Sequence, residues 1–276
     1  MFLPRHAFDA STPSRGAGAI NFLTSIWRVT AVASLFAFTG ITMAAENSMS
    51  SKSVVLVHGA WADGSSWNKV IPLLQAKGLH VVAVQNPLSS LADDVAATNR
   101  VINMQKGPVI LVGHSWAGVV ITEAGNNAKV AALVYVAAFA PDSGQSINDL
   151  IGGFPPAPYQ ATMSKDERGF LYLSTESVAQ YFAPDQSPAI QKIMAATQAP
   201  WFYGCLADKV TTASWHTKPS WWVLPTNDQI LDPRLQEGMA GAAKSTISRV
   251  ASSHVAMLSK PAEVAAAIIA AANSGN

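Results

Sequence analysis

Ser115 is the residue of this sequence whose surroundings most clearly suggest chemistry. It lies in VILVGHSWAG, where a run of apolar residues leads directly into a helical pattern. A strand that turns sharply into a helix exposes such a serine in a strained conformation, and the residues two places away must be small. Gly113 and Ala117 meet that need, although Ala117 stands where the strict motif has glycine, with Gly118 next. The segment therefore predicts a nucleophilic serine.

A serine nucleophile needs a base, and the chain offers six histidines. His254 follows the last predicted strand, at the sheet edge where loops gather in parallel α/β folds. His58 and His114 lie inside tight loops, where a role in orienting the backbone is the simpler interpretation. We expect His254 to be the base, with His216 as the second choice.

The base in turn needs an acid that holds its tautomer and stabilises the imidazolium. Asp228 ends a predicted strand and lies between Ser115 and His254, in the order Ser, Asp, His. Asp232 directly precedes a proline and is interpreted as a helix N-cap. We expect Asp228 to be the acid, and Asp142 is the other candidate.

Acyl-transfer chemistry also needs hydrogen-bond donors for a developing oxyanion. The backbone N–H of Trp116, directly after the serine, is one expected donor. The loop after the first predicted strand provides the other, from Ala60 or from Trp61, because Gly59 allows a sharp turn there. We also expect the Trp61 and Trp116 side chains to form an apolar pocket wall, while most other aromatic residues pack within the structure.

The elements that must position these residues alternate between short apolar runs and amphipathic stretches. Strands that alternate with helices predict βαβ units, and hence an α/β fold with a mostly parallel central sheet flanked by helices. The alternation of strands and helices is interrupted at residues 142–217. This segment is rich in proline, glycine and aromatic residues and predicts an inserted cap of short helices. The predicted strands lie within residues 53–59, 80–87, 108–115, 129–141, 219–228 and 245–254.

Five motifs together resemble the α/β-hydrolase superfamily: VLVHGAWADGSSW, LVGHSWAG, YVAAFAPDSGQS, PTNDQILDP and SSHVAMLSKP. Within it, the chain resembles the small esterases that include plant methylesterases, hydroxynitrile lyases and many bacterial esterases. The resemblance extends from Val54 to the final helix. It implies an α/β-hydrolase fold with a helical cap and no metal or organic cofactor. It also implies a site made of Ser115, Asp228 and His254, with Ala60 and Trp116 as the oxyanion donors.

The expected activity is hydrolysis of a carboxylic ester or lactone of a small to medium hydrophobic substrate, through an acyl-enzyme. Hydroxynitrile lyases of this group place a lysine directly after the catalytic histidine, whereas this chain has Val255 there. That difference favours hydrolysis over carbon–carbon bond cleavage. A member that only binds a small molecule remains a further alternative, because it would keep the pocket without needing the three site residues.

Composition excludes other classes of function. Lys and Arg number 18 against 17 Asp and Glu, so the chain lacks the basic excess typical of nucleic-acid binding. Cys205 is the single cysteine, which excludes an intrachain disulfide and a thiolate metal site. We interpret it as a small buried residue. The expected partner is a small-molecule ester, and nothing in the sequence defines an oligomeric state.

The N-terminal segment predicts the compartment. Residues 1–45 combine three arginines with an apolar run over residues 29–45 that ends in small residues. This arrangement is typical of a secretory signal peptide, so we expect a periplasmic or secreted protein with no membrane attachment after processing. The run is at the short limit for spanning a bilayer. A start at Met49 would instead give a cytoplasmic protein.

Overall fold

The computed structural model describes residues 52–274, and every element named below lies within them. The expected signal peptide at residues 1–45 and the alternative start at Met49 fall outside this range. Within residues 52–274, none of the helices has both the length and the apolar character needed to cross a membrane.

A parallel six-stranded sheet forms the centre of the fold, in the order β2-β1-β3-β4-β8-β9. The prediction of an α/β fold with a mostly parallel sheet is thus confirmed. The carboxyl ends of the strands all point the same way, which gathers the loops after them at one edge. The strands are β1 (Ser53–Val57), β2 (His80–Ala83), β3 (Val109–His114), β4 (Val130–Val136), β8 (Ser220–Pro225) and β9 (Thr246–Val250).

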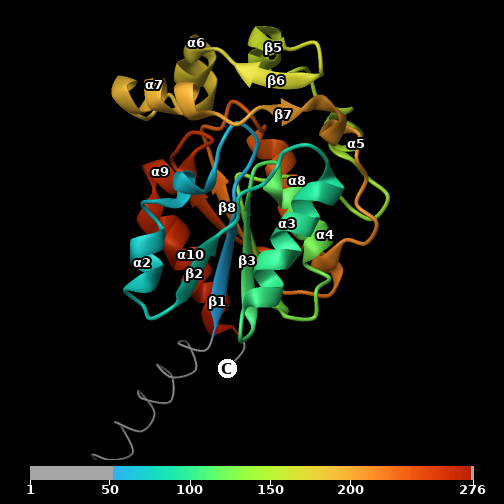
Figure 1. Cartoon of the computed structure of the whole chain (residues 1–276), viewed down its shortest axis with the longest axis vertical. Coiled ribbons are helices and arrows are strands. Elements are labelled where there is room, and N and C mark those ends of the chain that lie inside the picture. The colour runs from blue at the N-terminus through green and yellow to red at the C-terminus, as the bar shows by residue number, and fades with distance from the viewer. Residues whose placement is uncertain (1–51, 275–276) are drawn as a thin grey trace, which may run out of the picture. The chain divides into compact units, whose positions relative to one another are not determined.

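Helices cover both faces of this sheet. In Figure 1, α2 and α10 lie together on one side, and α3 and α4 lie together on the other. Helix α8 packs on β8, and α9 packs on α10. The helices of this layer are α2 (Ile71–Gln75), α3 (Leu91–Met104), α4 (Ala117–Ala124), α8 (Pro233–Ala242), α9 (Ala256–Ser259) and α10 (Pro261–Asn273).

Burial of the strands follows from this layering. Every residue of β1 and of β3 is buried, because each strand is covered by helices on both faces and flanked by other strands. The edge strands β2 and β9 are more exposed. The core is therefore densest around β3, the strand that leads into Ser115.

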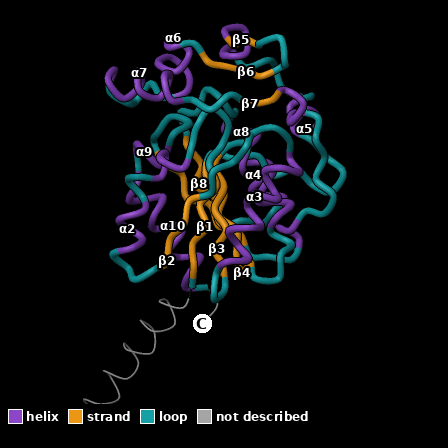
Figure 2. The backbone as a smooth tube through the Cα atoms, viewed as in Figure 1, coloured by secondary structure: helices purple, strands orange, loops and turns teal. Residues whose placement is uncertain are grey.

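A cap lies over the carboxyl ends of the strands, as Figure 2 shows. The prediction of short helices was incomplete, because the cap also contains an antiparallel sheet in the order β5-β6-β7. These strands are only two to four residues long, too short for an alternating pattern to reveal them. The cap elements are α5 (Ile147–Ile151), β5 (Met163–Lys165), β6 (Phe170–Leu173), α6 (Thr175–Ser177), α7 (Pro188–Thr197) and β7 (Trp201–Phe202).

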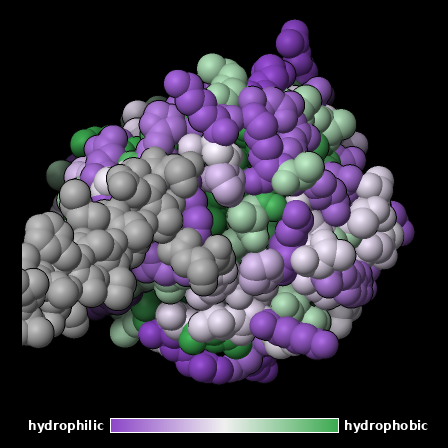
Figure 3. Space-filling view, turned by 90° about the horizontal axis from the view of Figure 1, so that it is seen from below, coloured by the Kyte–Doolittle hydropathy of each residue, from purple (hydrophilic) through white to green (hydrophobic). Residues whose placement is uncertain are grey.

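The opposite end of the molecule has a different surface. Figure 3 looks at the amino ends of the strands, and the atoms not covered in that view intersperse hydrophilic side chains with small hydrophobic areas. The apolar groups gathered beneath the cap have no counterpart in the visible part of this face. The loops that follow the strands, with the predicted site residues, lie at the other end of the sheet, beneath the cap.

Candidate active site

Ser115 occupies the turn between β3 and α4. Its φ of 55° lies in the left-handed region, which a residue with a side chain adopts only when its surroundings enforce it. The Ser115 carbonyl accepts hydrogen bonds from the N–H groups of Gly118 (2.9 Å) and Phe139 (3.2 Å), and its own N–H donates to Val136 (3.2 Å). This backbone network holds the serine at the carboxyl edge of the sheet.

Two glycines make room for this turn. A Cβ on Gly113 would lie 2.6 Å from the Ala117 carbonyl oxygen, and a Cβ on Gly59 would lie 2.8 Å from the Ser115 Cβ. Both positions therefore exclude side chains by close approach. Gly59 was expected to supply a sharp turn, but the left-handed φ in that loop belongs to Trp61, at 56°.

The expected base and acid lie together. His254 Nδ1 is 2.8 Å from Asp228 Oδ2, and both side chains are fully buried. Because a carboxylate accepts, the Nδ1–H is the donor and Nε2 carries the lone pair. Among residues 52–274, His254 Nε2 has no hydrogen-bond partner. It is thus a buried imidazole nitrogen available to a substrate or a hydroxyl.

Asp228 is itself held by further donors. Its Oδ1 accepts the N–H groups of Ile230 (2.9 Å) and Leu231 (3.0 Å), while its Oδ2 also accepts Gln236 Nε2 at 2.9 Å. These bonds fix the orientation of the carboxylate toward His254. The sequence analysis did not single out Gln236, whose position in α8 gives no local sign of this contact.

The two other buried histidines fit the backbone roles expected for them. His114 Nε2 lies 3.0 Å from the His254 carbonyl oxygen, and its ring lies 4.7 Å from the His254 ring. Burial lowers the pKa of His114 well below its usual range, so the ring is neutral. His58 Nε2 accepts the Asn86 N–H at 2.9 Å, and burial lowers its pKa also. His114 thereby places His254 beside the strand end that carries Ser115.

The second-choice base and acid pair with each other outside this site. His216 Nε2 is 2.7 Å from Asp142 Oδ1, but both side chains are about half exposed and this pair does not line the cavity around Ser115. Asp232 caps α8, where its carboxylate accepts the Arg234 N–H at 2.8 Å ahead of Pro233. The interpretation of Asp232 as an N-cap is confirmed.

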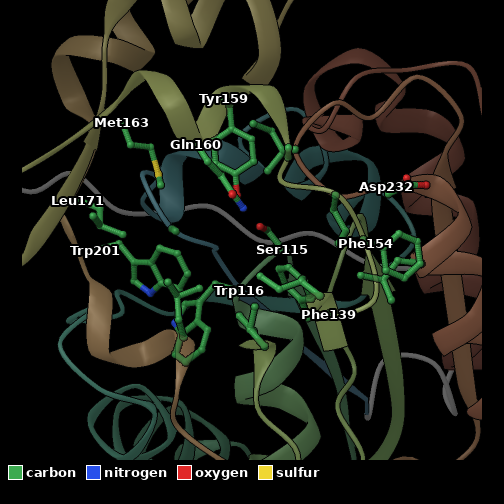
Figure 4. A pocket seen from close by; sticks show the side chains of 18 of the residues that line it. Ser115, Trp116, Phe139, Phe154, Tyr159, Gln160, Met163, Leu171, Trp201 and Asp232 are labelled. Atoms are coloured by element: carbon green, nitrogen blue, oxygen red, sulfur yellow. The ribbon is translucent and has the colours of Figure 1, made fainter. Parts of the chain in front are cut away.

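A cavity of about 290 Å³ opens beside Ser115. Figure 4 shows the Ser115 hydroxyl pointing into it, with the Trp116 and Trp201 indoles together on one side and Asp232 at the far edge. None of the described residues that line it is Lys or Arg. Ala60, Trp61 and Trp116 line it, together with cap residues that include Tyr159, Met163, Leu171, Trp201 and Leu206.

Trp61 connects the core to the cap. Its Nε1–H donates to the Leu171 carbonyl of β6 at 3.0 Å, and its ring contacts Tyr159, Phe182 and Trp201 edge-on at centroid distances of 5.5 to 6.2 Å. Aromatic pairs in this geometry stabilise one another beyond their buried area. Trp61 is therefore both a pocket wall and an attachment point for the cap.

A second attachment reaches the loop that carries His254. Asp185 of the cap accepts hydrogen bonds from the Ser253 N–H (2.7 Å) and the Ser253 hydroxyl (2.6 Å). Phe182, in a π-helical turn over residues 178–182, lies 5.4 Å from the His254 ring. The cap thus contacts the residue just before the histidine as well as the histidine itself. Sequence reasoning missed Asp185, which lies in an irregular cap loop.

Other ligand chemistries find little support in the described part of the chain. Residues 52–274 contain no group of three or more His, Cys, Asp or Glu side chains arranged to hold a metal ion. Cys205 is buried, and burial raises its pKa to about 12, so it is a protonated thiol.

Comparison with known sequences gives the family. Residues 54–267 match the model of the Alpha/beta hydrolase family. The chain is 35% identical over 115 residues to salicylic acid-binding protein 2 of Nicotiana tabacum, covering 33% of this chain and 41% of that protein. It is 31% identical over 111 residues to a carbendazim hydrolyzing esterase of a Nocardioides species, covering 35% and 46%. The chain thus aligns with less than half the length of either relative.

Solved structures show the same fold. A pyrethroid hydrolase from Sphingobium faniae superposes with a TM-score of 0.69 at 20% identity, covering 81% of this chain and 98% of the other. Polyneuridine aldehyde esterase superposes with a TM-score of 0.68 at 19% identity, covering 79% and 98%. The family model, together with the parallel sheet and the turn at Ser115, identifies this chain as a member of the alpha/beta hydrolase family.

Proposed function

We propose that this chain is a serine hydrolase that cleaves carboxylic esters or lactones through an acyl-enzyme. The observation that carries the proposal is the buried His254–Asp228 hydrogen bond beside the strained turn of Ser115. In this mechanism His254 Nε2 takes the Ser115 proton as the oxygen attacks the carbonyl, and then gives it to the leaving alcohol. Asp228 stabilises the imidazolium formed in between. A water molecule activated by His254 releases the acyl group.

Two backbone donors support the oxyanion part of the proposal. Ala60 and Trp116 both line the cavity with Ser115. Across residues 52–274, no hydrogen-bond acceptor is assigned to the backbone N–H of either residue. Unoccupied donors next to a nucleophile suit the negative oxygen of a tetrahedral intermediate, and one such donor typically contributes about 10²- to 10³-fold in rate.

The pocket favours a neutral, hydrophobic substrate. Its volume of about 290 Å³ lies near the lower end for ligand pockets, about 300 Å³, and its walls are largely aromatic and aliphatic. The esterase names of the relatives agree with an ester bond as the target. We therefore propose a small to medium hydrophobic group on the acyl or the alcohol side.

Two alternatives have less support. A hydroxynitrile lyase would need a cation to receive cyanide, but Val255 is buried and no Lys or Arg appears among the described lining residues. A protein that only binds its ligand would need neither the His254–Asp228 pair nor the strained serine. Both features cost folding free energy. The His254–Asp228 pair buries a carboxylate, and Ser115 holds an unfavourable φ.

The test combines labelling with turnover. A fluorophosphonate probe should label the wild-type protein at Ser115, and Ser115→Ala should abolish labelling and lower hydrolysis of p-nitrophenyl butyrate by about 10⁴-fold or more. Ser143→Ala, at an exposed serine distant in sequence, is the matched control and should label normally. Undiminished turnover by Ser115→Ala would refute the mechanism, whereas release of cyanide from mandelonitrile would favour the lyase.

We also propose that residues 1–45 are an export signal, removed to leave a periplasmic or secreted enzyme. The arginine-rich start and the apolar run that ends in small residues support this proposal. Mass spectrometry of the mature N-terminus tests it. A first residue close to Glu46 is expected, and a protein that begins at Met49 and remains in the cytoplasm would contradict it.

A further inference from the structure

Asp94 is a buried carboxylate for which the proposed mechanism has no use. It lies on the face of α3 that is turned inward, together with Leu91, Ala97 and Ile102. A carboxylate in such surroundings costs free energy unless both oxygens are bonded. Its neighbour Asp93 is exposed and bonds to Ser89 and Ser90 at the start of the helix. Of these two aspartates, Asp94 is therefore the one whose burial the site must explain.

Each oxygen of Asp94 has one donor. Asp94 Oδ2 accepts the Trp116 indole N–H at 2.7 Å, and Asp94 Oδ1 accepts the Leu88 backbone N–H at 2.8 Å. The first donor belongs to the residue directly after the nucleophile. The second belongs to a buried leucine with a φ of 59°, a conformation that a non-glycine residue holds only when its surroundings impose it.

The second bond continues into the cap. The Leu88 carbonyl accepts the Phe202 N–H of β7 at 2.9 Å, and Trp201 precedes Phe202 in the same strand. The Trp116 and Trp201 rings are in contact at a centroid distance of 5.5 Å, with their planes tilted by 50°. Both line the cavity, side by side next to Ser115 (Figure 4). The Asp94 carboxylate thus holds the Trp116 indole directly. Through Leu88 it also holds β7, the strand that carries Trp201.

We propose that Asp94 is a positioning residue that sets the spacing of the Trp116 and Trp201 indoles and thereby selects the hydrophobic substrate group that fits beside Ser115. This inference rests on the proposed function, because it assigns part of the selectivity of that same site. Asp94 touches neither Ser115 nor His254 in this arrangement. It therefore acts by positioning the indoles of the pocket wall and takes no part in proton transfer.

The titratable groups around Asp94 are consistent with this role. Asp93 lies on the same helix, and Asp208 and Cys205 come from the segment that follows β7. Asp208 accepts the Leu91 N–H at 2.8 Å, so it is committed to the start of α3. Burial raises the pKa of Asp94 to about 6. An apolar residue could fill the same space without the cost of burying a carboxylate. Holding the Trp116 indole by a hydrogen bond, in contrast, requires an acceptor.

Asp94→Asn tests the role with little change in volume. Asparagine offers one acceptor oxygen in place of two, so either Trp116 or Leu88 loses its acceptor. The variant should be compared with wild type on p-nitrophenyl acetate, butyrate and octanoate. We expect the ratio of kcat/KM between long and short esters to change by about 5- to 20-fold, through KM, with kcat on acetate changed by no more than about 3-fold. Asp93→Asn, the matched control, should keep the native ratio.

A double-mutant cycle separates positioning from general destabilisation. Trp116→Phe removes the indole donor but leaves the backbone N–H in place. If Asp94 acts on the wall through Trp116, Asp94→Asn will change the selectivity ratio by a smaller factor in the Trp116→Phe background than in the native one. Equal factors in the two backgrounds, or a uniform loss on every ester, would overturn the proposal.

Active-site titration with a fluorophosphonate distinguishes failure of this inference from failure of the proposed function. Absence of labelling in the wild type would remove the serine mechanism itself. Normal labelling with native selectivity in Asp94→Asn would remove only the positioning role. Rates are expressed per labelled site, so a smaller folded fraction cannot imitate a change in selectivity.

A measurement on the wild type covers the case in which Asp94→Asn does not fold. The Trp116 indole N–H resonance can be identified by its loss in Trp116→Phe. We expect slow exchange of this proton with solvent, and a shift when an octyl phosphonate replaces a methyl phosphonate on Ser115. Rapid exchange, or the same resonance position with both phosphonates, would overturn the proposal.

Discussion

The sheet edge and the cap contribute to the candidate site by different means. At the sheet edge, Asp228, His254 and Gln236 are joined by buried hydrogen bonds of 2.8 and 2.9 Å. The cap contributes mainly aromatic and aliphatic side chains, such as Tyr159 and Trp201. Hydrogen bonds fix atoms to within a few tenths of an ångström, whereas apolar packing tolerates a change of shape. In the proposed mechanism, the sheet edge therefore determines the reaction and the cap determines which substrate fits.

The largest effect is expected when a sheet-edge side chain is replaced by one of the same shape but different chemistry. Asp228→Asn should lower kcat by about 10⁴-fold with a small change in KM, because an amide cannot hold the imidazolium or its tautomer. Steady-state kinetics on p-nitrophenyl butyrate measures the effect. Asp166→Asn, at an exposed aspartate that does not line the cavity, is the control and should stay within about 3-fold of wild type. A modest loss in Asp228→Asn would show that another acid orients His254.

Asp94 of α3 is a buried carboxylate behind the pocket wall, and its titration tests how far a charge is tolerated there. The folded pKa is about 6, against 3.8 for an ordinary aspartate. Below pH 3.8 the group is protonated in both states and has no effect on stability. Between pH 3.8 and 6 the unfolded state releases the proton while the folded state keeps it, so stability falls across this range and about 3 kcal/mol is lost by pH 7.

Urea unfolding of wild type and Asp94→Asn at pH 4 and pH 7 measures this effect. The stability of the wild type relative to the variant should fall by roughly 2–3 kcal/mol between those values. A difference between the two proteins that does not depend on pH would contradict the assignment. Asp93→Asn, which neutralises the exposed neighbour, serves as the control.

Trp201→Ala sharpens the comparison from the cap side. Removal of this indole should lower kcat/KM for butyrate and longer esters by roughly 10- to 100-fold, mostly through KM, because the wall loses buried aromatic area. The kcat value should change little. Ile193→Ala alters a 56% exposed residue of α7 that does not line the cavity, and it should behave as wild type. A loss confined to kcat in Trp201→Ala would mean that the cap takes part in the chemistry.

The smallest effect is expected for the exposed pair outside both regions. His216→Ala and Asp142→Asn should each leave kcat within about 2-fold of wild type, since an ion pair between half-exposed side chains contributes little. The same ester assay measures this. A large loss in either variant would return these residues to the list of catalytic candidates.

The sequence allowed much of the sheet edge to be predicted, because its signals are local. Strand β3 is a continuous apolar run, and the small residues around Ser115 follow from the steric needs of the turn. The proximity of Asp228 and His254 follows from parallel strands that end at one edge.

The cap could be predicted only in outline. Strands of two to four residues show no usable periodicity, and the contacts that position the cap join residues far apart in the chain. Asp185 and Ser253 are one such pair, and Leu88 and Phe202 are another. Asp94 lies among the apolar positions of α3, but the helix dipole is a sufficient explanation for two adjacent acids at a helix start, so the sequence does not set Asp94 apart from Asp93.

The hydrogen bonds between Asp185 and Ser253 bear on attempts to redesign the protein by exchanging parts. A cap taken from another family member and joined at residues 142 and 217 would lack the carboxylate that holds the backbone directly before His254. Such a chimaera could fold and bind a new ester, yet turn it over slowly, because its histidine loop would be released. A cap exchanged into this scaffold should therefore retain Asp185, because this residue joins the cap to the loop that carries His254.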